Sequence, residues 1–368
     1  MIEAVSSLDL TVVGAEELPK ALENARRSRL LALYFIGSTK TSTIPGLSVA
    51  GATPELTLYT PACDVEYMVY GRPKSFDAIP VTPEGIPTPA VITRACLKLC
   101  SFPYVVVDVG SALEPKIPHI SLPSRRVGEP IDTGRALPIE VASSLYEEAK
   151  TLARALRGID LFMLGESIPG GTTTTLGILS ALGYNAWGKV SSASPSNPHE
   201  LKERVVKEGL AKAGVKVEEA RRNPLKAVAA VGDPVHVSIA GFTHGALEAG
   251  AKVVLAGGTQ MASVLAIAKH MGVDVSDVAV ATTRWIISDR TSSLADLIRQ
   301  IEPSVKIVAA NLDFSDAPFE GLRYYEKGYV KEGVGAGGTA VLAHLTTGKT
   351  MKQLQEAIYE EYRALTQK

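Results

Sequence analysis

Short runs of apolar residues recur along the chain, separated by polar or glycine-rich segments. Each run is four to seven residues long, which is the usual length of a buried strand. The runs lie at residues 30–36, 104–110, 161–164, 226–232, 252–256, 278–282 and 306–310. Apolar segments of helical length lie between several of them, for example at 90–99 and 138–156. This alternation predicts an α/β fold with a mostly parallel, doubly wound, Rossmann-like sheet.

Both ends of the chain carry the pattern of amphipathic helices. Residues 16–27 place four apolar side chains on one helical stripe, and residues 349–366 form a longer amphipathic segment. We therefore expect a nucleotide-binding α/β domain over residues 30–330. A smaller helical part, formed by 1–29 and 331–368, is expected to complete the site. Residues 55–69 look like strand material interrupted by Pro61.

Composition and charge exclude several classes of protein. The 368 residues are 46% hydrophobic and 21% charged, as in compact globular proteins. Because 38 basic residues balance 39 acidic ones and form no block, we do not expect nucleic acid as a partner. No apolar run is long enough to span a bilayer and the start of the chain lacks a signal-peptide pattern, so a cytoplasmic location is expected.

The stretch from 160 to 184 has the most distinctive pattern. A short apolar run leads into a turn with three glycines, Gly165, Gly170 and Gly171, and then into four successive threonines and an apolar helix. The start of a helix after a glycine-rich turn presents backbone N–H groups and a partial positive charge, which together bind phosphate. Glu166 lies inside the same turn, where a carboxylate would repel a bare phosphate. Its presence indicates a ligand that carries positive charge close to its phosphate.

A second glycine-rich segment occupies residues 333–338 and follows Glu332. It satisfies the letters of a dinucleotide-binding fingerprint, but no buried strand precedes it and too little chain follows it, so we exclude NAD. The glycines give the backbone close access to whatever Glu332 contacts. A third turn, Gly257-Gly258-Thr259-Gln260, repeats the strand–turn–helix layout.

Other cofactor sites are not indicated. The chain has no phosphate-loop signature of nucleotide hydrolases, and its six histidines do not follow metal-ligand spacing. We expect neither a metal nor a cofactor.

Four motifs in order resemble those of the nicotinate-nucleotide–dimethylbenzimidazole phosphoribosyltransferase family. Residues 165–173 resemble its Gly-Glu-Met-Gly-Ile-Gly-Asn-Thr-Thr signature, and residues 331–336 resemble its late Leu-Gly-Glu-Gly-Thr-Gly-Ala motif. Residues 107–110 match its Val-Asp-Val-Gly strand end, and residues 257–262 are similar to its Gly-Gly-x-Glu-Ile-Ala turn. The resemblance extends over residues 80–345.

The resemblance implies a two-domain α/β homodimer and a metal-independent pentosyltransferase. Such an enzyme moves the phosphoribosyl group of nicotinate mononucleotide to a benzimidazole nitrogen, which makes the lower-ligand nucleotide of cobamides. The family's catalytic base falls on Glu332 and its second important carboxylate on Glu166. We expect substrate contacts from the three turns, the acidic strand end and one arginine, namely Gly165, Gly170, Gly171, Thr172, Thr173, Thr174, Asp108, Gly110, Gly257, Gly258, Gln260, Arg284, Gly333 and Gly335.

The physical chemistry of the reaction agrees with these roles. Glycosyl transfer passes through a cation-like transition state, which a carboxylate close to the ribose stabilises. The incoming azole must lose a proton, which a buried glutamate of raised pKa accepts.

Several departures from the family pattern leave the acceptor base open. Residues 60–85 contain no counterpart of the family's Asp-His-Gly segment, Gln260 replaces a glutamate, and Thr283-Arg284-Trp285 stands where the family has Asp-Gly-Phe. Two other functions therefore stay open. One is a nucleotide-binding homologue without catalysis, and the other is a hydrolase or phosphorylase of N-glycosidic bonds.

Overall fold

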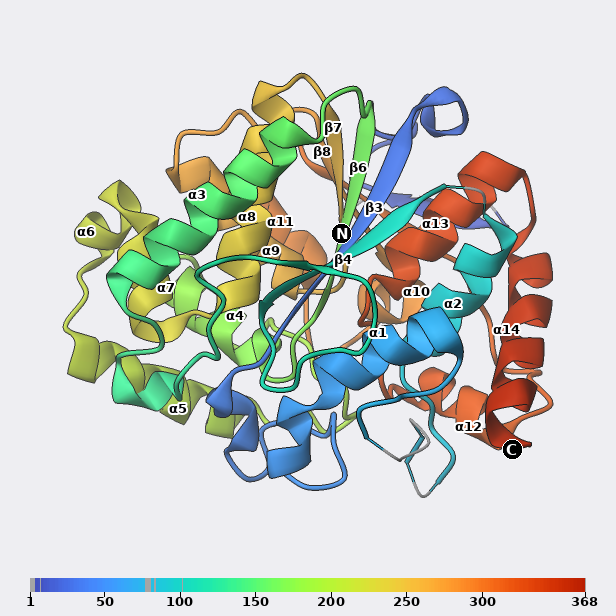
Figure 1. The fold of residues 1–368 in the computed structure, drawn as a ribbon, viewed down its shortest axis with the longest axis horizontal. Coiled ribbons are helices and arrows are strands. Elements are labelled where there is room, and N and C mark those ends of the chain that lie inside the picture. The colour runs from blue at the N-terminus through green and yellow to red at the C-terminus, as the bar shows by residue number, and fades with distance from the viewer. Residues whose placement is uncertain (1–3, 7, 77–80, 83, 101, 368) are drawn as a thin grey trace.

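One nine-stranded sheet runs through the centre of the molecule (Figure 1). The computed structural model describes residues 4–6, 8–76, 81–82, 84–100 and 102–367. In these ranges the strand order is β1-β2-β9-β8-β7-β6-β3-β4-β5. The strands are β1 (Ala4–Ser6), β2 (Leu10–Val13), β3 (Leu30–Gly37), β4 (Tyr104–Gly110), β5 (Ile120–Ser121), β6 (Leu161–Ser167), β7 (Lys252–Ala256), β8 (Val278–Thr283) and β9 (Lys306–Ala310).

The order of the strands fixes where a ligand can bind. All pairs from β9 to β5 are parallel, whereas β1 pairs with β2, and β2 with β9, antiparallel. β4 and β5 follow β3 in the chain and lie on one side of it in the sheet. β6 to β9 come later in the chain and lie on the other side of β3. The strand order therefore reverses between β3 and β6, and open α/β sheets bind ligands at the carboxyl end of such a point.

Helices cover both faces of the sheet, as the sequence pattern predicted. Figure 1 shows two groups on either side of the central strands. The first group is α3 (Ile139–Ala155), α4 (Gly171–Ala181), α5 (His199–Ala213), α6 (Val217–Arg222), α7 (Pro224–Val231), α8 (Pro234–Glu248), α9 (Gln260–His270) and α11 (Leu294–Ile301). The second is α1 (Thr60–Tyr70), α2 (Ala90–Leu99), α10 (Arg284–Ile287), α12 (Glu320–Arg323), α13 (Ala336–Thr347) and α14 (Met351–Thr366).

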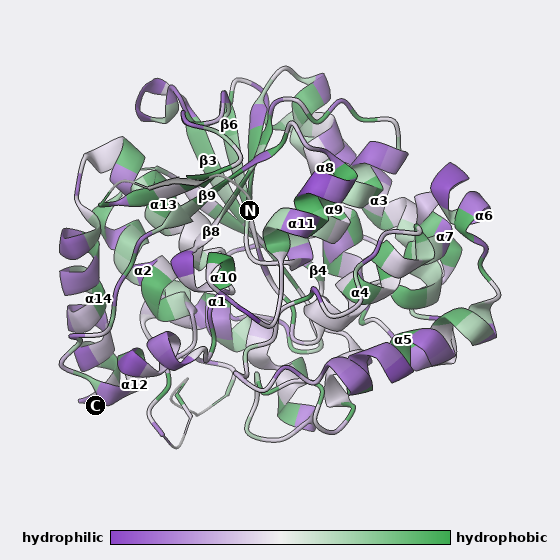
Figure 2. Ribbon diagram, turned by 180° about the vertical axis from the view of Figure 1, so that it is seen from behind, coloured by the Kyte–Doolittle hydropathy of each residue, from purple (hydrophilic) through white to green (hydrophobic). Residues whose placement is uncertain are grey.

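Alternate residues of each strand supply two separate hydrophobic cores. In β3, Leu31, Leu33 and Phe35 pack with the first group of helices, whereas Ala32 and Tyr34 pack with the second. Figure 2 shows hydrophobic residues gathered on the central strands and hydrophilic ones along the outer helices α5 and α14. Within the described ranges, no helix is long and apolar enough to cross a membrane.

Three local predictions are wrong. Residues 16–27 do not form an α-helix but a mostly irregular segment with one short 3-10 turn, Ala25–Arg27, after a strand of the main sheet. Residues 55–69 are largely helix α1 and residues 226–232 are largely helix α7, not strands. Pro61 and Pro224 lie in the first turns of these helices, where proline is tolerated because the N–H group it lacks has no partner there.

The helical character expected of the two chain ends is therefore present only at the carboxyl end. There, α14 matches the amphipathic segment predicted at 349–366, and α13 precedes it as a further helix. The described part of 1–29 instead extends the sheet at the β9 edge. The division of the chain into two domains stays a prediction.

Candidate active site

The carboxyl ends of three neighbouring strands bring the predicted turns together. Glu166 and Ser167 end β6, the Gly257-Gly258 turn follows β7, and Thr283 ends β8. A side chain added at Gly258 would place its Cβ 3.7 Å from the Cβ of Glu332. The glycine-rich turns therefore gather at one rim of the sheet.

The Glu166 turn and the Glu332 segment touch backbone to backbone. The Val334 N–H donates a hydrogen bond of 2.8 Å to the carbonyl oxygen of Glu166. A Cβ on Gly165 would lie 3.1 Å from the Cα of Gly335, which itself adopts a φ of 62°. Glycine suits both positions because a Cβ at Gly165 or Gly335 would lie 3.1 or 3.2 Å from the Cα of the other residue, closer than an ordinary contact.

Replacement of Gly335 by alanine is therefore expected to lower the free energy of unfolding by about 1–2 kcal/mol, the cost of a left-handed conformation for an L-residue. The new Cβ would also press on Gly165. Denaturant titration measures the loss. Gly348→Ala is the matched control, because Gly348 has a φ of 75° and no atom within 4 Å of an added Cβ. An equal loss in both variants would show that the contact with Gly165 adds nothing.

Four donors hold the partly exposed carboxylate of Glu332. Its Oε1 accepts hydrogen bonds from the N–H groups of Gly333 and Gly337, at 3.2 and 3.0 Å. Its Oε2 accepts from the Thr283 N–H at 3.0 Å and from the Thr282 hydroxyl at 3.2 Å. Burial raises the pKa of the Glu332 carboxyl to about 7, although these donors favour its charged form.

Glu166 is more deeply buried and has fewer partners. Its side chain is 2% exposed, and its Oε2 accepts one hydrogen bond, from the Ile168 N–H at 3.0 Å. Burial and, next, the nearby negative charge of Glu332 raise the pKa of the Glu166 carboxyl to about 8. Each ionised carboxylate therefore disfavours the ionisation of the other. No ion pair engages either group among the described residues.

The backbone around Glu332 adopts an unusual conformation. Val330, Lys331 and Val334 have φ angles of 61°, 64° and 51°, in the left-handed region that side chains disfavour. Strained residues of this kind persist only where neighbouring structure holds them, and they concentrate at functional sites. Here the Val330 N–H is held by the carbonyl oxygen of Ala193 at 2.8 Å.

The first turn of α4 lies next to Gln260. A Cβ on Gly171 would clash with the Gln260 amide nitrogen, so the glutamine side chain lies directly against this turn. The four threonine hydroxyls do not converge on one spot, because successive residues of a helix point about 100° apart. The Thr174 hydroxyl donates to Asp233 and that of Thr175 bonds Ser263 at 3.0 Å.

Two buried lysines beside the site were not anticipated from the sequence. The Lys202 ammonium, which is fully buried, donates to the carbonyl oxygen of Ser191 at 2.6 Å and to Asn197 Oδ1 at 2.9 Å. Lys331 forms an ion pair with Asp289 at 3.2 Å. Burial and the charge of Lys331 lower the pKa of Lys202 to about 7. Lysine spacing along the chain gives no sign of this burial, so no sequence signal could have found it.

Asp64 of α1 is a third unanticipated group. It is 4% exposed, and it accepts hydrogen bonds from the Ser167 hydroxyl at 2.8 Å and from the Thr88 hydroxyl at 2.6 Å. Ser167 is the neighbour of Glu166. The misassigned strand over 55–69 concealed this residue, because only a helix turns its side chain toward β6.

Asp108, Gly110 and Arg284 each have a polar group engaged within the protein. The Asp108 carboxylate accepts from the Gly110 and Ser111 N–H groups and pairs with Arg125 at 2.6 Å. Arg284 pairs with Asp313 at 3.0 Å and with Glu326. The Arg284 Nε has no hydrogen-bond partner among the described residues. Substrate contacts from Asp108, Gly110 and Arg284 stay predictions.

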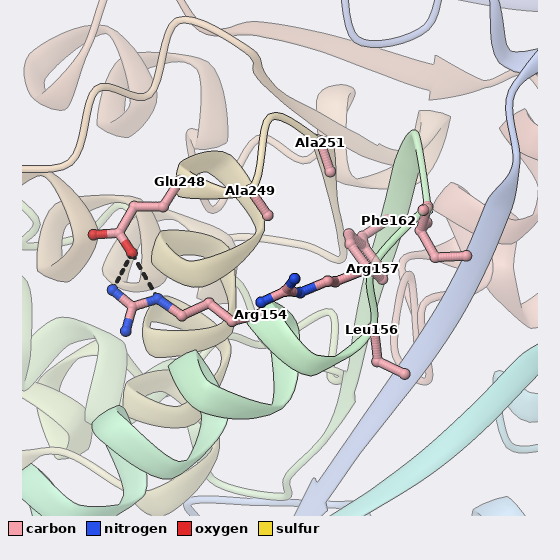
Figure 3. Close-up of a pocket in the computed structure, with 9 residues that line it drawn as sticks. Arg154, Leu156, Arg157, Phe162, Glu248, Ala249 and Ala251 are labelled. Carbon is pink, nitrogen blue, oxygen red and sulfur yellow. Dashed lines mark hydrogen bonds and ion pairs between the residues drawn. The ribbon is translucent and has the colours of Figure 1, made fainter.

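The structure contains a cavity of about 400 Å³ lined by Arg284 and a second one away from the paired glutamates. In the described part of the chain, no group of three His, Cys, Asp or Glu side chains is placed to hold a metal ion. A cavity of about 440 Å³ lies at the opposite edge of the sheet, near the starts of β6 and β7, where Arg154 pairs with Glu248 (Figure 3). Its position separates it from the rim that carries the two glutamates.

Comparisons with known proteins agree with this picture. A family model described as "Phosphoribosyltransferase" matches residues 91–286. A UPF0284 protein from Aeropyrum pernix is 48% identical over 353 residues, which are 95% of this chain and 96% of that protein. Another from Pyrococcus furiosus is 49% identical over 337 residues, 91% of this chain and 98% of that one.

Two solved structures from Thermus thermophilus share the fold. One is a nicotinate-nucleotide–dimethylbenzimidazole phosphoribosyltransferase with a TM-score of 0.59 and 18% identity, covering 94% of this chain and 87% of its own. The other, CobT, has a TM-score of 0.58 and 19% identity, covering 95% and 92%.

Proposed function

Because this chain belongs to the nicotinate-nucleotide–dimethylbenzimidazole phosphoribosyltransferase family, we propose that it moves the 5-phosphoribosyl group of nicotinate mononucleotide to a benzimidazole-like base and releases nicotinate. The product would be the lower-ligand nucleotide of a cobamide. The proposal is carried by the direct backbone contact between the segment of Glu166 and the segment of Glu332, which are far apart in the chain. A homodimer and a cytoplasmic location accompany it as predictions.

Glu166 would act on the donor nucleotide. The pyridinium ring of nicotinate mononucleotide and the cation-like ribose of the transition state are both positively charged next to C1′. A cation brought beside Glu166 favours its ionised form and so lowers the pKa that burial has raised. The negative charge of the Glu166 carboxylate would then lie beside the positively charged ribose and stabilise the transition state.

Glu332 would accept the proton of the azole. A carboxylate has about four acceptor positions, and four donors occupy them in this structure. The Thr282 hydroxyl is the donor that rotates most easily, so it would turn away as the azole N–H approaches Oε2. A pKa of about 7 suits a general base at neutral pH.

The phosphate would lie between the first turn of α4 and the segment that follows residue 190. Ser191 bonds Thr259 through its N–H and its hydroxyl, both at 3.0 Å, and accepts from Lys202 through its carbonyl oxygen. An ammonium has three N–H donors, and two are used here, which leaves one for a ligand. Phosphate binding would raise the depressed pKa of Lys202 and take up a proton above pH 7.

Replacement of Lys202 by methionine is expected to weaken nicotinate mononucleotide binding about tenfold or more, the usual effect of losing one charged hydrogen bond. Calorimetry measures the dissociation constant. Lys212→Met, on the exposed face of the same helix, is the control and should bind normally. Unchanged affinity in the Lys202 variant would place the phosphate elsewhere.

The direct test is release of nicotinate. The protein is incubated with nicotinate mononucleotide and a panel of azoles in the presence of a chelator, and the products are separated by chromatography. We expect nicotinate and an azole nucleotide in equal amounts. Ribose 5-phosphate as the product would indicate a hydrolase, and binding without any release would indicate a non-catalytic homologue.

A further inference from the structure

A chain of polar contacts inside the protein joins Lys202 to Lys331. The Lys202 ammonium donates to Asn197 Oδ1 at 2.9 Å, and the Asn197 amide donates to the carbonyl oxygen of Thr291 at 3.3 Å. The Thr291 hydroxyl donates to Asp289 Oδ1 at 2.8 Å. The other oxygen of Asp289 pairs with the Lys331 ammonium at 3.2 Å. These contacts connect two lysine side chains that are both buried.

Lys331 lies next to Glu332 and helps to hold its carboxylate. The carbonyl oxygen of Lys331 accepts the Thr283 hydroxyl at 2.6 Å, and the Thr283 N–H donates to the Glu332 carboxylate at 3.0 Å. Lys331 has a φ of 64°, which a residue with a side chain keeps only where its neighbours hold it. Among the described residues, its ammonium forms one ion pair, with Asp289. This ion pair therefore anchors the backbone that carries Glu332.

The segment that follows residue 190 gives a second contact between the same two regions. The carbonyl oxygen of Ser191 accepts the Lys202 ammonium at 2.6 Å, and that of Ala193 accepts the Val330 N–H at 2.8 Å. A Cβ on Gly328 would lie 3.6 Å from the Cβ of Pro195. The surroundings of Lys202 and the backbone before Glu332 therefore pack directly against each other.

The chain of contacts holds more positive than negative charge. Lys202 and Lys331 contribute two ammonium groups, and Asp289, whose side chain is 5% exposed, contributes the one carboxylate between them. A buried cation is costly unless an anion pairs with it. A phosphate dianion bound at Lys202 would supply the missing negative charge and stabilise both lysines in their observed positions.

We propose that the ion pair between Asp289 and Lys331 positions Glu332 and makes turnover depend on the phosphate bound at Lys202. The inference rests on the proposed function and adds how phosphate binding and base catalysis are coupled. Phosphate would fix Lys202 and, through the chain of contacts, the backbone that carries Glu332. Part of the binding energy of the phosphate would then appear in kcat. Asp289 and Lys331 act through Glu332, so they are positioning residues.

The test supplies the phosphate separately from the rest of the substrate. Nicotinate riboside, which lacks the phosphate, is incubated with an azole, and nicotinate release is measured with and without inorganic phosphite. In the wild type, phosphite should raise kcat/KM for the riboside about tenfold or more, as is usual for coupling between two sites. Calorimetry measures phosphite binding to the same preparations.

Two variants break the ion pair from opposite ends. Asp289→Asn and Lys331→Met should each reduce the activation by phosphite about fivefold or more. The double variant should lose no more than Lys331→Met alone, because both changes remove one link. Lys331→Met leaves no ammonium unpaired, so it tests the proposal even where Asp289→Asn fails to fold. Asp296→Asn, which removes a carboxylate paired with Lys189 at 2.7 Å, is the control and should keep full activation.

The outcomes distinguish this coupling from the proposed function. A wild type that phosphite does not activate, or variants that it activates as strongly as the wild type, would overturn the coupling. Failure of nicotinate mononucleotide itself to release nicotinate would instead refute the proposed function. Hydrogen exchange then measures the coupling without turnover, because inorganic phosphate should slow exchange over residues 329–335 about threefold or more in the wild type and not in Lys331→Met. Exchange that phosphate leaves unchanged in the wild type would also overturn the coupling.

Discussion

The Glu332→Gln variant is expected to turn over about 10³-fold more slowly than the wild type, because the loss of a general base usually costs 10²- to 10⁴-fold. An amide cannot accept the azole proton at neutral pH. Nicotinate mononucleotide should still bind, since Glu332 is assigned to the acceptor. Steady-state rates and calorimetry measure the two effects on the same preparation.

The variant needs a structural control because of the four donors around Glu332. The amide NH₂ of glutamine would face two of them, and the N–H of Thr283 or of a glycine would lose its acceptor. We expect about 1–3 kcal/mol of destabilisation from that unpaired group. Glu320→Gln removes the same charge from an exposed position of α12 and should change neither rate nor stability. Retained turnover in Glu332→Gln would remove this residue from the role of base.

The Glu166→Gln variant is expected to lose about 10²- to 10³-fold in kcat, the usual effect of removing one electrostatic contact to a transition state. Glutamine resembles the protonated acid in shape. If Glu166 acts as a carboxylate, the variant cannot develop the required charge. If it acts in its neutral form, the variant keeps most of the activity, and the role assigned here is wrong.

The same variant tests the raised pKa of Glu166, because that pKa affects how the free energy of unfolding depends on pH. The pKa of Glu166 is raised from 4.5 to about 8, so between these pH values the folded state binds more protons than the unfolded state. The free energy of unfolding of the wild type should therefore fall as pH rises through this window, by up to about 1.4 kcal/mol per pH unit for each proton. Glu166→Gln should remove its share of this slope and be more stable than the wild type above pH 8. An unchanged slope in denaturant titrations would mean that Glu166 ionises normally.

The sheet and the main chemical groups were predictable because they depend on local pattern. Runs such as 30–36 and 252–256 are strands β3 and β7, and the glycine-rich turns follow strands that end at one rim. Glu166 and Glu332 could be named because each lies in a glycine-rich segment whose letters resemble a family motif. Parallel topology then brings such segments together without any further signal in the sequence.

The wrong secondary-structure predictions arise where a local sequence pattern is compatible with two kinds of structure. A run such as 226–232, rich in Ala and Val, fits a buried strand and a buried helix equally well, and Pro224 marks a helix start only once the helix is known. Strand β2 forms because β9, far away along the chain, offers an edge to pair with. Lys202 and Asp64 lie beside the site because of how their helices, α5 and α1, are oriented. That orientation depends on tertiary packing, which could not be read from the sequence.

The left-handed residues on either side of Glu332 have a consequence for how the enzyme inactivates. Val330, Lys331 and Val334 would relax if their anchors at Ala193 and Glu166 opened, whereas the parallel strands beneath would remain paired. Regions held in this way open locally at lower free energy than the core. Mild urea should therefore abolish catalysis well before circular dichroism reports any loss of secondary structure, and dilution should restore it at once.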